Sequence, residues 1–274
     1  MSQEFTGPYH EELSVAIRAA REAGEIIRRR AGRIGSDDVR AKGFNDLVTI
    51  VDEEVQEHII RTLTETFPGS RILAEEGQAS SLVAGDGYLW IIDPIDGTTN
   101  FTHGVPPYAV SIALHDGNDL AVAVVLDAAH GELFTATRGG GLFLNGERQR
   151  VSDTDRLQDS LITTGFPYRE MAHLEVYLGV LGEFMRRTRG VRRPGSAAID
   201  LAYVAVGRFD GFFETGLNPW DVAAGILLIE EGGGRATDYM DRERPIFEKQ
   251  IVASNGRIHE EMLAVLEPMK DIRL

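Results

Sequence analysis

The sequence of 274 residues contains no cysteine, which excludes disulfide bonds, thiolate metal sites and a cysteine nucleophile. It also has no apolar run of the ~20 residues that a membrane-spanning helix needs, and its longest apolar stretches, such as 120–126, have the length of strands. The first residues, 1–14, are polar and acidic and lack the basic start and apolar stretch of a secretory signal. We therefore expect a cytoplasmic protein that does not enter a membrane.

Basic side chains are scarce as well. Lysine and arginine together number 28, against 43 aspartates and glutamates, which gives a formal net charge of −15 at pH 7. Nucleic-acid binding needs a basic surface, so we expect no direct contact with nucleic acid. The same charge would repel a phosphorylated substrate unless bound metal ions reversed the local field.

Hydrophobic residues make up 43% of the chain, enough for the core of one large domain or two small ones. Apolar residues that recur every three or four positions predict amphipathic helices at 11–30 and from Asp52 to about Phe67. Short β-like runs separated by turn signals then predict a largely antiparallel sheet, with strands at 71–74, 88–92, 108–114, 120–126, 132–137 and 141–144.

Beyond about residue 150 the pattern changes to an alternation of strands and helices. Strands are predicted at 161–164, 209–214 and 251–253, and helices at 174–188, 197–206, 220–230 and 259–266. The sequence thus predicts an α+β half, 1–150, followed by an α/β half, 151–274, built from layers of helices and sheets.

The stretch "WIIDPIDGTTNF", residues 90–101, places two aspartates three positions apart with no basic residue beside them. Asp93 follows a buried strand, and Pro94 cannot continue the strand ladder, so we expect the chain to turn there. Asp96 would then swing back toward Asp93 and leave the carbonyl of Ile95 free. Oxygen donors of this kind suit hard cations such as Mg²⁺ or Mn²⁺.

The residues that follow, Gly97, Thr98 and Thr99, are suited to open a helix whose free backbone amides bind an anion. A metal cluster beside such amides is typical of a phosphate site. The alternative is a turn rich in aspartate in which Asp96 caps the helix.

Further acids and one lysine are candidates for the same site. Glu75 and Glu76 follow the strand at 71–74, and the alternative is a solvated pair in a loop. Asp221 lies in the first turn of a helix, where the helix dipole alone would favour an acid. Asp52 opens the second helix and could be an ordinary N-cap, and Lys42 could be a solvated surface lysine.

Five segments together resemble the inositol monophosphatase family of Mg²⁺-dependent, Li⁺-sensitive phosphatases. They are "KGFNDLVTIVD" at 42–52, "AEEG" at 74–77, "DPIDGTTNF" at 93–101, "WDVAAG" at 220–225 and "GGGRATD" at 232–238, and they span almost the whole chain. The stretch 192–221 resembles the bacterial SuhB-type branch in particular. The resemblance implies a five-layered αβαβα sandwich, usually a homodimer, that hydrolyses myo-inositol monophosphate to inositol and phosphate.

The resemblance also implies a ligand set for two to three Mg²⁺ ions, for which Mn²⁺ could substitute. Glu75, Asp93 and the Ile95 carbonyl would hold the first ion. Asp93 would bridge to a second ion, held also by Asp96 and Asp221, and a third, weaker ion would lie near Glu75.

For the substrate, the resemblance implies an in-line attack on phosphorus by a water that Thr98 and Asp52 activate. The backbone amides of Gly97 and Thr98 would hold the phosphate, and Lys42 is a further candidate for the site. The substrate hydroxyls would contact Asp96, Gly195, Ser196, Ala197, Glu214 and Asp221.

One departure from the family leaves the substrate open. The animal inositol enzymes have His-Cys before the tryptophan, where this sequence has Asn218 and Pro219. Relatives with nearly the same metal motif hydrolyse fructose 1,6-bisphosphate, histidinol phosphate, 3′-phosphoadenosine phosphate or NADP. The stretch "TTNFTHGVPPYAVSIAL", 98–114, reads more like the inositol branch, and adenine-binding insertions are not obvious.

A function of another class also stays open, because some SuhB-type proteins act as partners of RNA polymerase. An arginine cluster in this acidic chain could serve as a docking patch for such a partner. The alternatives are a solvated helix end, a dimer interface or a substrate-side element. The cluster comprises Arg186, Arg187, Arg189, Arg192 and Arg193.

Overall fold

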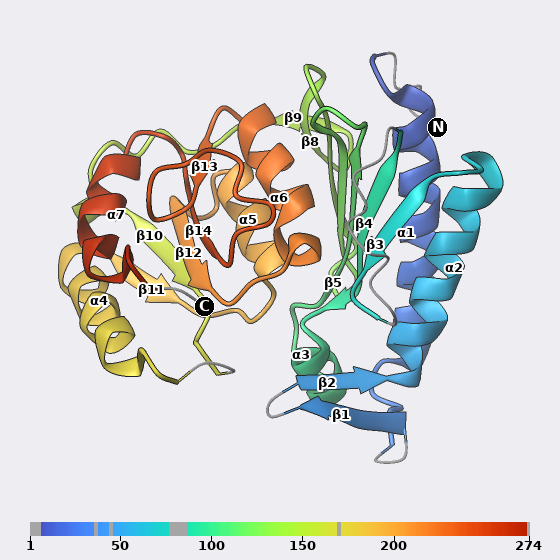
Figure 1. The fold of residues 1–274 in the computed structure, drawn as a ribbon, viewed down its shortest axis with the longest axis horizontal. Coiled ribbons are helices and arrows are strands. Elements are labelled where there is room, and N and C mark those ends of the chain that lie inside the picture. Colours follow the sequence, from blue (N-terminus) through green and yellow to red (C-terminus); the bar gives the residue numbers. More distant parts are fainter. Residues whose placement is uncertain (1–6, 36–37, 44–45, 77–86, 169–170, 273–274) are drawn as a thin grey trace.

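The computed structural model describes residues 7–35, 38–43, 46–76, 87–168 and 171–272. Helices and sheets alternate in five layers, which confirms the αβαβα sandwich (Figure 1). The outer layers are α1 (His10–Arg30) with α2 (Ile50–Thr66) on one side and α4 (Leu174–Arg187) with α7 (His259–Leu266) on the other. Between the two sheets lie α5 (Ala197–Ala205) and α6 (Pro219–Glu231).

The larger sheet has seven strands in chain order, and only its first pair, β3 with β4, is parallel. This agrees with the largely antiparallel sheet that the sequence predicts. The strands are β3 (Arg71–Ala74), β4 (Leu89–Asp96), β5 (Ala109–His115), β6 (Leu120–Asp127), β7 (Glu132–Thr137), β8 (Gly141–Leu144) and β9 (Glu147–Gln149).

The second sheet has the order β11-β10-β12-β14-β13 and mixes parallel and antiparallel pairs. Its strands are β10 (Leu161–Thr164), β11 (Gly190–Arg192), β12 (Gly211–Thr215), β13 (Arg235–Thr237) and β14 (Gln250–Ser254). The remaining elements are the hairpin of β1 (Val39–Gly43) and β2 (Asp46–Thr49), α3 (Thr98–His103), and the short 3₁₀ helices η2 (Leu157–Asp159) and η3 (Glu267–Met269).

Five of these strands, β1, β2, β9, β11 and β13, were not expected from the sequence. Each has only three to five residues, and charged residues interrupt its apolar pattern. The strand β4 also differs, because it continues through Pro94 to Asp96 instead of ending at Ile92.

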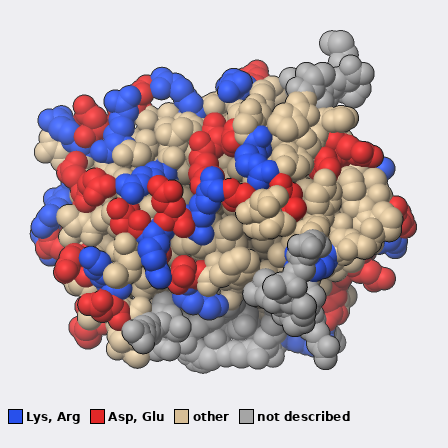
Figure 2. Space-filling view, turned by 45° about the horizontal axis from the view of Figure 1, so that its top comes forward, with Lys and Arg blue, Asp and Glu red and all other residues tan. Residues whose placement is uncertain are grey.

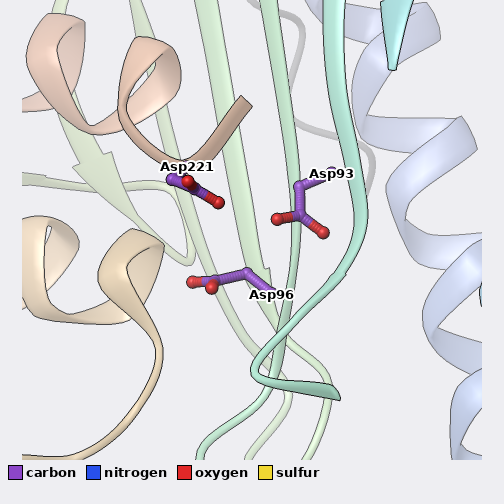
Figure 3. Close-up of side chains that lie close together, drawn as sticks. All are labelled: Asp93, Asp96 and Asp221. Atoms are coloured by element: carbon purple, nitrogen blue, oxygen red, sulfur yellow. The ribbon is translucent and has the colours of Figure 1, made fainter. Parts of the chain in front are cut away.

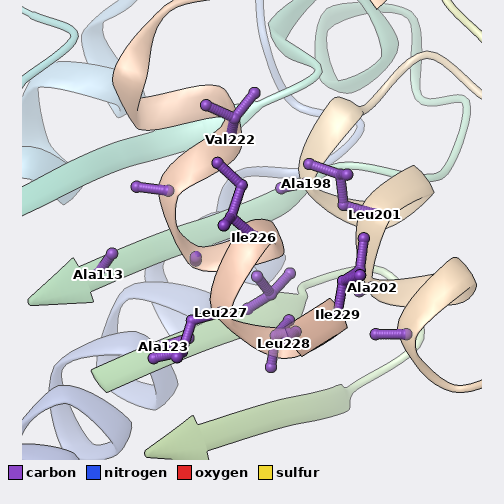
Figure 4. Close-up of a cluster of buried hydrophobic side chains, with 14 of the residues drawn as sticks. Ala113, Ala123, Ala198, Leu201, Ala202, Val222, Ile226, Leu227, Leu228 and Ile229 are labelled. Atoms are coloured by element: carbon purple, nitrogen blue, oxygen red, sulfur yellow. The ribbon is translucent and has the colours of Figure 1, made fainter. Parts of the chain in front are cut away.

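The helices α5 and α6 join the two halves of the chain in one core. Ile226 and Leu227 of α6 pack with Leu201 of α5 and with alanines of the seven-stranded sheet, Ala113 on β5 and Ala123 on β6 (Figure 4). The predicted division near residue 150 falls between the two sheets, but helices from the second half cover the sheet of the first. This packing places the beginnings of α5 and α6 beside the end of β4.

The surface carries both signs of charge. On the face shown in Figure 2, lysine and arginine side chains are interspersed with aspartates and glutamates, without a broad basic area. Within the described ranges, no helix is both long enough and apolar enough to cross a membrane.

Candidate active site

An irregularity in β4 brings the two aspartates of "DPID" to the same face of the sheet. In the pairing with β5, Asp93 lies opposite Ser111 and Asp96 opposite Ala109, so three steps along β4 match two along β5. In a regular strand, residues three apart point to opposite faces. The extra residue reverses the alternation, and Ile95 packs with the α1–α2 side while Asp96 contacts α5. Pro94, which has no backbone N–H, is accommodated in this bulge rather than ending the strand.

Asp93, Asp96 and Asp221 converge at this point. One carboxylate oxygen from each lies within 4.8 Å of the other two, and Figure 3 shows the three side chains close together, two from β4 and one from the beginning of α6. The register contributes to this convergence, because Ser111, opposite Asp93, donates a hydrogen bond of 3.2 Å to the carbonyl of Trp220. The start of α6 is thereby fixed over the end of β4.

Asp93 is the buried centre of the cluster. Among the described residues, no hydrogen-bond donor reaches its Oδ1. Burial raises the pKa of the Asp93 carboxyl well above its ordinary value. The negative charges of neighbouring carboxylates raise this pKa further, in the order Glu75, Asp96, Asp221 and Asp52. A buried carboxylate with an unsatisfied oxygen among acids is stable as an anion only with a cation.

Asp96 is oriented by the first turn of α5. Its Oδ2 accepts hydrogen bonds of 2.6 Å from Ser196 Oγ and 2.6 Å from the backbone amide of Ala198. Burial raises the pKa of Asp96, and these hydrogen bonds lower it. The alternative that Asp96 caps the following helix is wrong, because the N-cap of α3 is Gly97 and no side chain caps that helix. Asp96 instead accepts an amide in the first turn of the distant helix α5.

Asp221 occupies the first turn of α6, as the sequence predicts, and its Oδ2 accepts the backbone amide of Asn218 at 2.6 Å. The side chain of Asn218 accepts a hydrogen bond of 2.6 Å from Lys249 Nζ. The position that departs from the animal inositol enzymes therefore interacts with a lysine.

Glu75 lies beside β4, close enough for its charge to act on Asp93. It follows β3, and its amide donates to the carbonyl of Ile92 on β4 at 3.2 Å. Gln56 of α2 holds the next residue, Glu76, through its backbone, with hydrogen bonds of 2.6 Å to the carbonyl and 2.9 Å from the amide. Of the four neighbouring carboxylates, Glu75 raises the pKa of Asp93 most, so its charge lies near the cluster.

Asp52 and Thr98 form a hydrogen-bonded pair next to the cluster. The hydroxyl of Thr98 lies 3.1 Å from Asp52 Oδ1 and 3.0 Å from the Ile95 carbonyl, so its single proton serves one of these acceptors at a time. Asp52 Oδ2 accepts the backbone amide of Thr49 at 2.8 Å and its hydroxyl at 2.5 Å. Burial raises the pKa of Asp52, and the hydrogen bonds lower it. The N-cap of α2 is Thr49, so the N-cap alternative for Asp52 is wrong.

The turn after Asp96 approaches the segment before α5 closely. Gly97 has φ 93°, and a Cβ at this position would lie 3.2 Å from the carbonyl oxygens of Gly195 and Pro107. Asn100 holds this contact together by donating to the carbonyls of Pro107 at 2.8 Å and Pro194 at 2.9 Å. Gly97 and Gly195, both candidates from the sequence, are therefore brought side by side.

The other candidates lie in three places. Ser196 is the N-cap of α5 and Ala197 its first residue, so both adjoin Asp96. Glu214 is on β12. Lys42 is on β1, and its side chain lies outside the described part of the structure.

Sequence reasoning missed two residues that position the site. Thr49 could have been found, since Thr-x-x-acid before an apolar run, here "TIVD", is a capping-box pattern. Gln56 has no such signal, because its role depends on the approach of α2 to β3 in the folded chain.

The donor set fits divalent cations of the Mg²⁺ type. The converging groups are carboxylate oxygens, and no thiolate or imidazole is among the described ligand candidates. The unsatisfied Oδ1 of Asp93 is the observation of this structure that calls for a cation.

Comparison with known proteins gives a consistent result. The chain matches the model of the inositol monophosphatase family over residues 9–270. It is similar to Nus factor SuhB of Pseudomonas aeruginosa, with 44% identity over 262 residues that cover 93% of this chain and 96% of the relative. Among solved structures, suhB of Bartonella henselae has 38% identity and a TM-score of 0.88, with 94% of this chain and 98% of that chain covered. The IMPase of Thermotoga maritima has 38% identity and a TM-score of 0.86, with coverage of 96% and 100%.

Proposed function

Because the chain belongs to the inositol monophosphatase family, a family of phosphatases, we propose that it is a Mg²⁺-dependent phosphomonoesterase acting on myo-inositol monophosphate. The observation that carries the proposal is the buried carboxylate of Asp93, with one unsatisfied oxygen, at the centre of converging acids. A protein retains such an arrangement at a cost in stability, and a bound cation removes that cost.

The grouping of Asp93, Asp96 and Asp221 and the resemblance to the family support the proposed ligands. Glu75, Asp93 and the Ile95 carbonyl would hold one ion, and Asp93, Asp96 and Asp221 a second, with a weaker third ion near Glu75. When bound, Mg²⁺ supplies the activation of a water nucleophile and the stabilisation of the leaving alkoxide. Mn²⁺ prefers similar oxygen ligands and would substitute.

The proposed proton path uses Thr98 and Asp52. When Thr98 donates its proton to Asp52 Oδ1, its oxygen presents a free lone pair to an attacking water. Thr98 then takes up the water proton as its own moves to Asp52. Burial raises the pKa of Asp52, which makes it a better proton acceptor than an exposed aspartate.

The proposed substrate contacts lie on both sides of the carboxylates. The amides of Gly97 and Thr98 would bind the phosphate oxygens, since they precede the first hydrogen bonds within α3. The hydroxyl proton of Ser196 is already donated to Asp96, so Ser196 would accept from the substrate rather than donate to it. Further hydroxyl contacts would involve Gly195, Ala197, Glu214, Asp96 and Asp221.

A panel of phosphate esters tests the substrate. We expect the highest kcat/KM for myo-inositol 1-phosphate, with side activity on glycerol 2-phosphate, because the metal site binds phosphate more firmly than the pocket distinguishes alcohols. The other members are fructose 1,6-bisphosphate, histidinol phosphate and nucleotide phosphates. A clear preference for one of these would move the chain to another branch of the family.

A second candidate function is a partner of the transcription machinery, supported by relatives that carry the name Nus factor SuhB. The arginine cluster divides in the structure. Arg186 and Arg187 at the end of α4 both pair with Glu183, and Arg193 lies over the rings of Phe166 and Tyr168. Exposed ion pairs of this kind contribute little and exchange readily for a partner's acids.

A pulldown with RNA polymerase subunits tests this role. We expect retention that Arg187→Glu weakens while phosphatase activity is unchanged. Equal retention by the variant would remove the cluster from consideration. The proposed homodimer is tested separately by light scattering, where the mass of a single chain would contradict it.

A further inference from the structure

Gly165 and Glu214 are in contact near the C-terminal ends of two neighbouring strands in the second sheet, β10 and β12. The strands β10 and β12 are parallel neighbours, with Thr164 opposite Phe213, so the next residues of the two strands, Gly165 and Glu214, lie side by side. A Cβ at Gly165 would lie 1.9 Å from Cδ and 1.9 Å from Oε1 of Glu214. The carboxylate of Glu214 therefore occupies the space that any other residue at position 165 would fill.

The backbone of Gly165 cannot easily withdraw. Its carbonyl accepts a hydrogen bond of 2.6 Å from the Tyr177 hydroxyl, and Thr164 Oγ1 donates to the carbonyl of Phe213 at 2.7 Å. Gly165 itself is buried. The Glu214 carboxylate is the far end of a flexible side chain, whereas Gly165 lies in the backbone, so an added methyl group would displace the carboxylate rather than the strand.

The position of Glu214 also relates to the first turn of α5. Burial raises the pKa of Asp200 in that turn, and of the nearby charges Glu214 raises it most. Thr163 of β10 fixes Asp200 through a hydrogen bond of 2.8 Å. The charge of Glu214, beside the end of β10, therefore also acts on the helix that orients Asp96.

We propose that Gly165 is the positioning residue for Glu214. Because Gly165 has no Cβ, the carboxylate of Glu214 can lie against it, and this sets where the carboxylate meets a hydroxyl of the substrate. The inference rests on the proposed function, in which Glu214 accepts a hydrogen bond from a polyol phosphate. Gly165 then acts on the selection between substrates and not on the hydrolysis of the phosphate ester.

The test is Gly165→Ala, measured on two substrates. For myo-inositol 1-phosphate we expect kcat/KM to fall roughly 10- to 100-fold, the range for a hydrogen bond to a charged group that is not made. For phenyl phosphate, which has no alcohol hydroxyl, the change should stay within about threefold. The matched control is Gly179→Ala on α4, where a Cβ meets nothing within 4 Å and both substrates should react as with the wild type.

A double variant separates positioning of Glu214 from general damage. Glu214→Ala removes the atoms that a methyl group at 165 would strike, so adding Gly165→Ala should change neither the substrate ratio nor the melting temperature further. The proposal would be overturned if Gly165→Ala lowered kcat/KM equally for both substrates. It would also be overturned if the effects of the two substitutions on kcat/KM and melting temperature were fully additive in the double variant. If the wild type hydrolyses no polyol phosphate, the proposed function fails. The melting temperatures of the wild type, the two single variants and the double variant still decide whether Gly165 accommodates Glu214.

Discussion

Replacement of Asp93 by asparagine should stabilise the metal-free protein while abolishing its response to Mg²⁺. The carboxylate is buried, its Oδ1 has no donor in the described structure, and four acids raise its pKa. Asparagine has the same shape, carries no charge, and offers N–H donors to the neighbouring carboxylates. Removing an unsatisfied buried group should raise the free energy of unfolding by about 1–3 kcal/mol, which corresponds to a rise in Tm of roughly 2–10 °C for a chain of this size.

The stabilisation should depend on pH. A carboxyl whose folded pKa is raised contributes its stability fully below the unfolded pKa, near 4, and loses it as pH rises through the folded value. The metal-free wild type should therefore lose stability above pH ~4 relative to Asp93→Asn, and the difference between the two proteins should grow with pH.

The assay is thermal unfolding in EDTA and in Mg²⁺, with Asp210→Asn as the matched control. Asp210 is also buried, but its oxygens accept from Ser152 Oγ at 2.6 Å and from the amide of Leu161 at 2.6 Å. Its replacement should destabilise the protein and leave the stabilisation by Mg²⁺ intact, about 2.7 kcal/mol at a hundredfold excess over Kd. The reasoning about Asp93 is refuted if Asp93→Asn melts at a lower temperature than the wild type in EDTA. It is also refuted if Mg²⁺ raises the melting temperature of the variant as much as that of the wild type.

Three other outcomes are expected. Burial lowers the pKa of His259 to about 4, so the free energy of unfolding should fall by up to about 3 kcal/mol as pH falls from 6.5 toward 4. Urea titrations of the wild type and of His259→Gln measure this loss, and the same loss in the variant would contradict the prediction. Gly97→Ala should lower kcat/KM roughly 10- to 100-fold, because its Cβ would press on the carbonyls of Gly195 and Pro107, and wild-type kinetics would show that the turn does not position substrate. Li⁺, close to Mg²⁺ in size with half its charge, should inhibit at saturating substrate and less so as Mg²⁺ rises; the absence of inhibition would require another arrangement of the second ion.

The sequence predicts much of the fold because its longer elements have clear periodicity. The helix α1 repeats apolar residues on one face and carries Glu11 and Glu12 in its first turn and arginines in its last, as the helix dipole favours. The strand β7 is predicted to the residue. The strand β11 has only three residues and forms because it pairs with β10. No local sequence pattern predicts that pairing.

The site is predictable where its residues are close in sequence and not where packing joins distant segments. The spacing of Asp93 and Asp96 indicates a shared cation site, but the bulge that turns both to one face depends on the register with β5. Asp96 is oriented by Ser196 of α5, a contact across about a hundred residues that no local pattern encodes. The same holds for Gly165, whose relation to Glu214 exists only once β10 and β12 pair.

The most direct test of the central claim is phosphate release from myo-inositol 1-phosphate by the purified wild-type protein. We predict turnover with Mg²⁺, none in EDTA, recovery when Mg²⁺ is restored in excess, and none by Asp93→Asn under any of these conditions. Turnover that persists in EDTA, or in Asp93→Asn, would contradict the assignment of the carboxylate cluster as the metal site of a phosphatase.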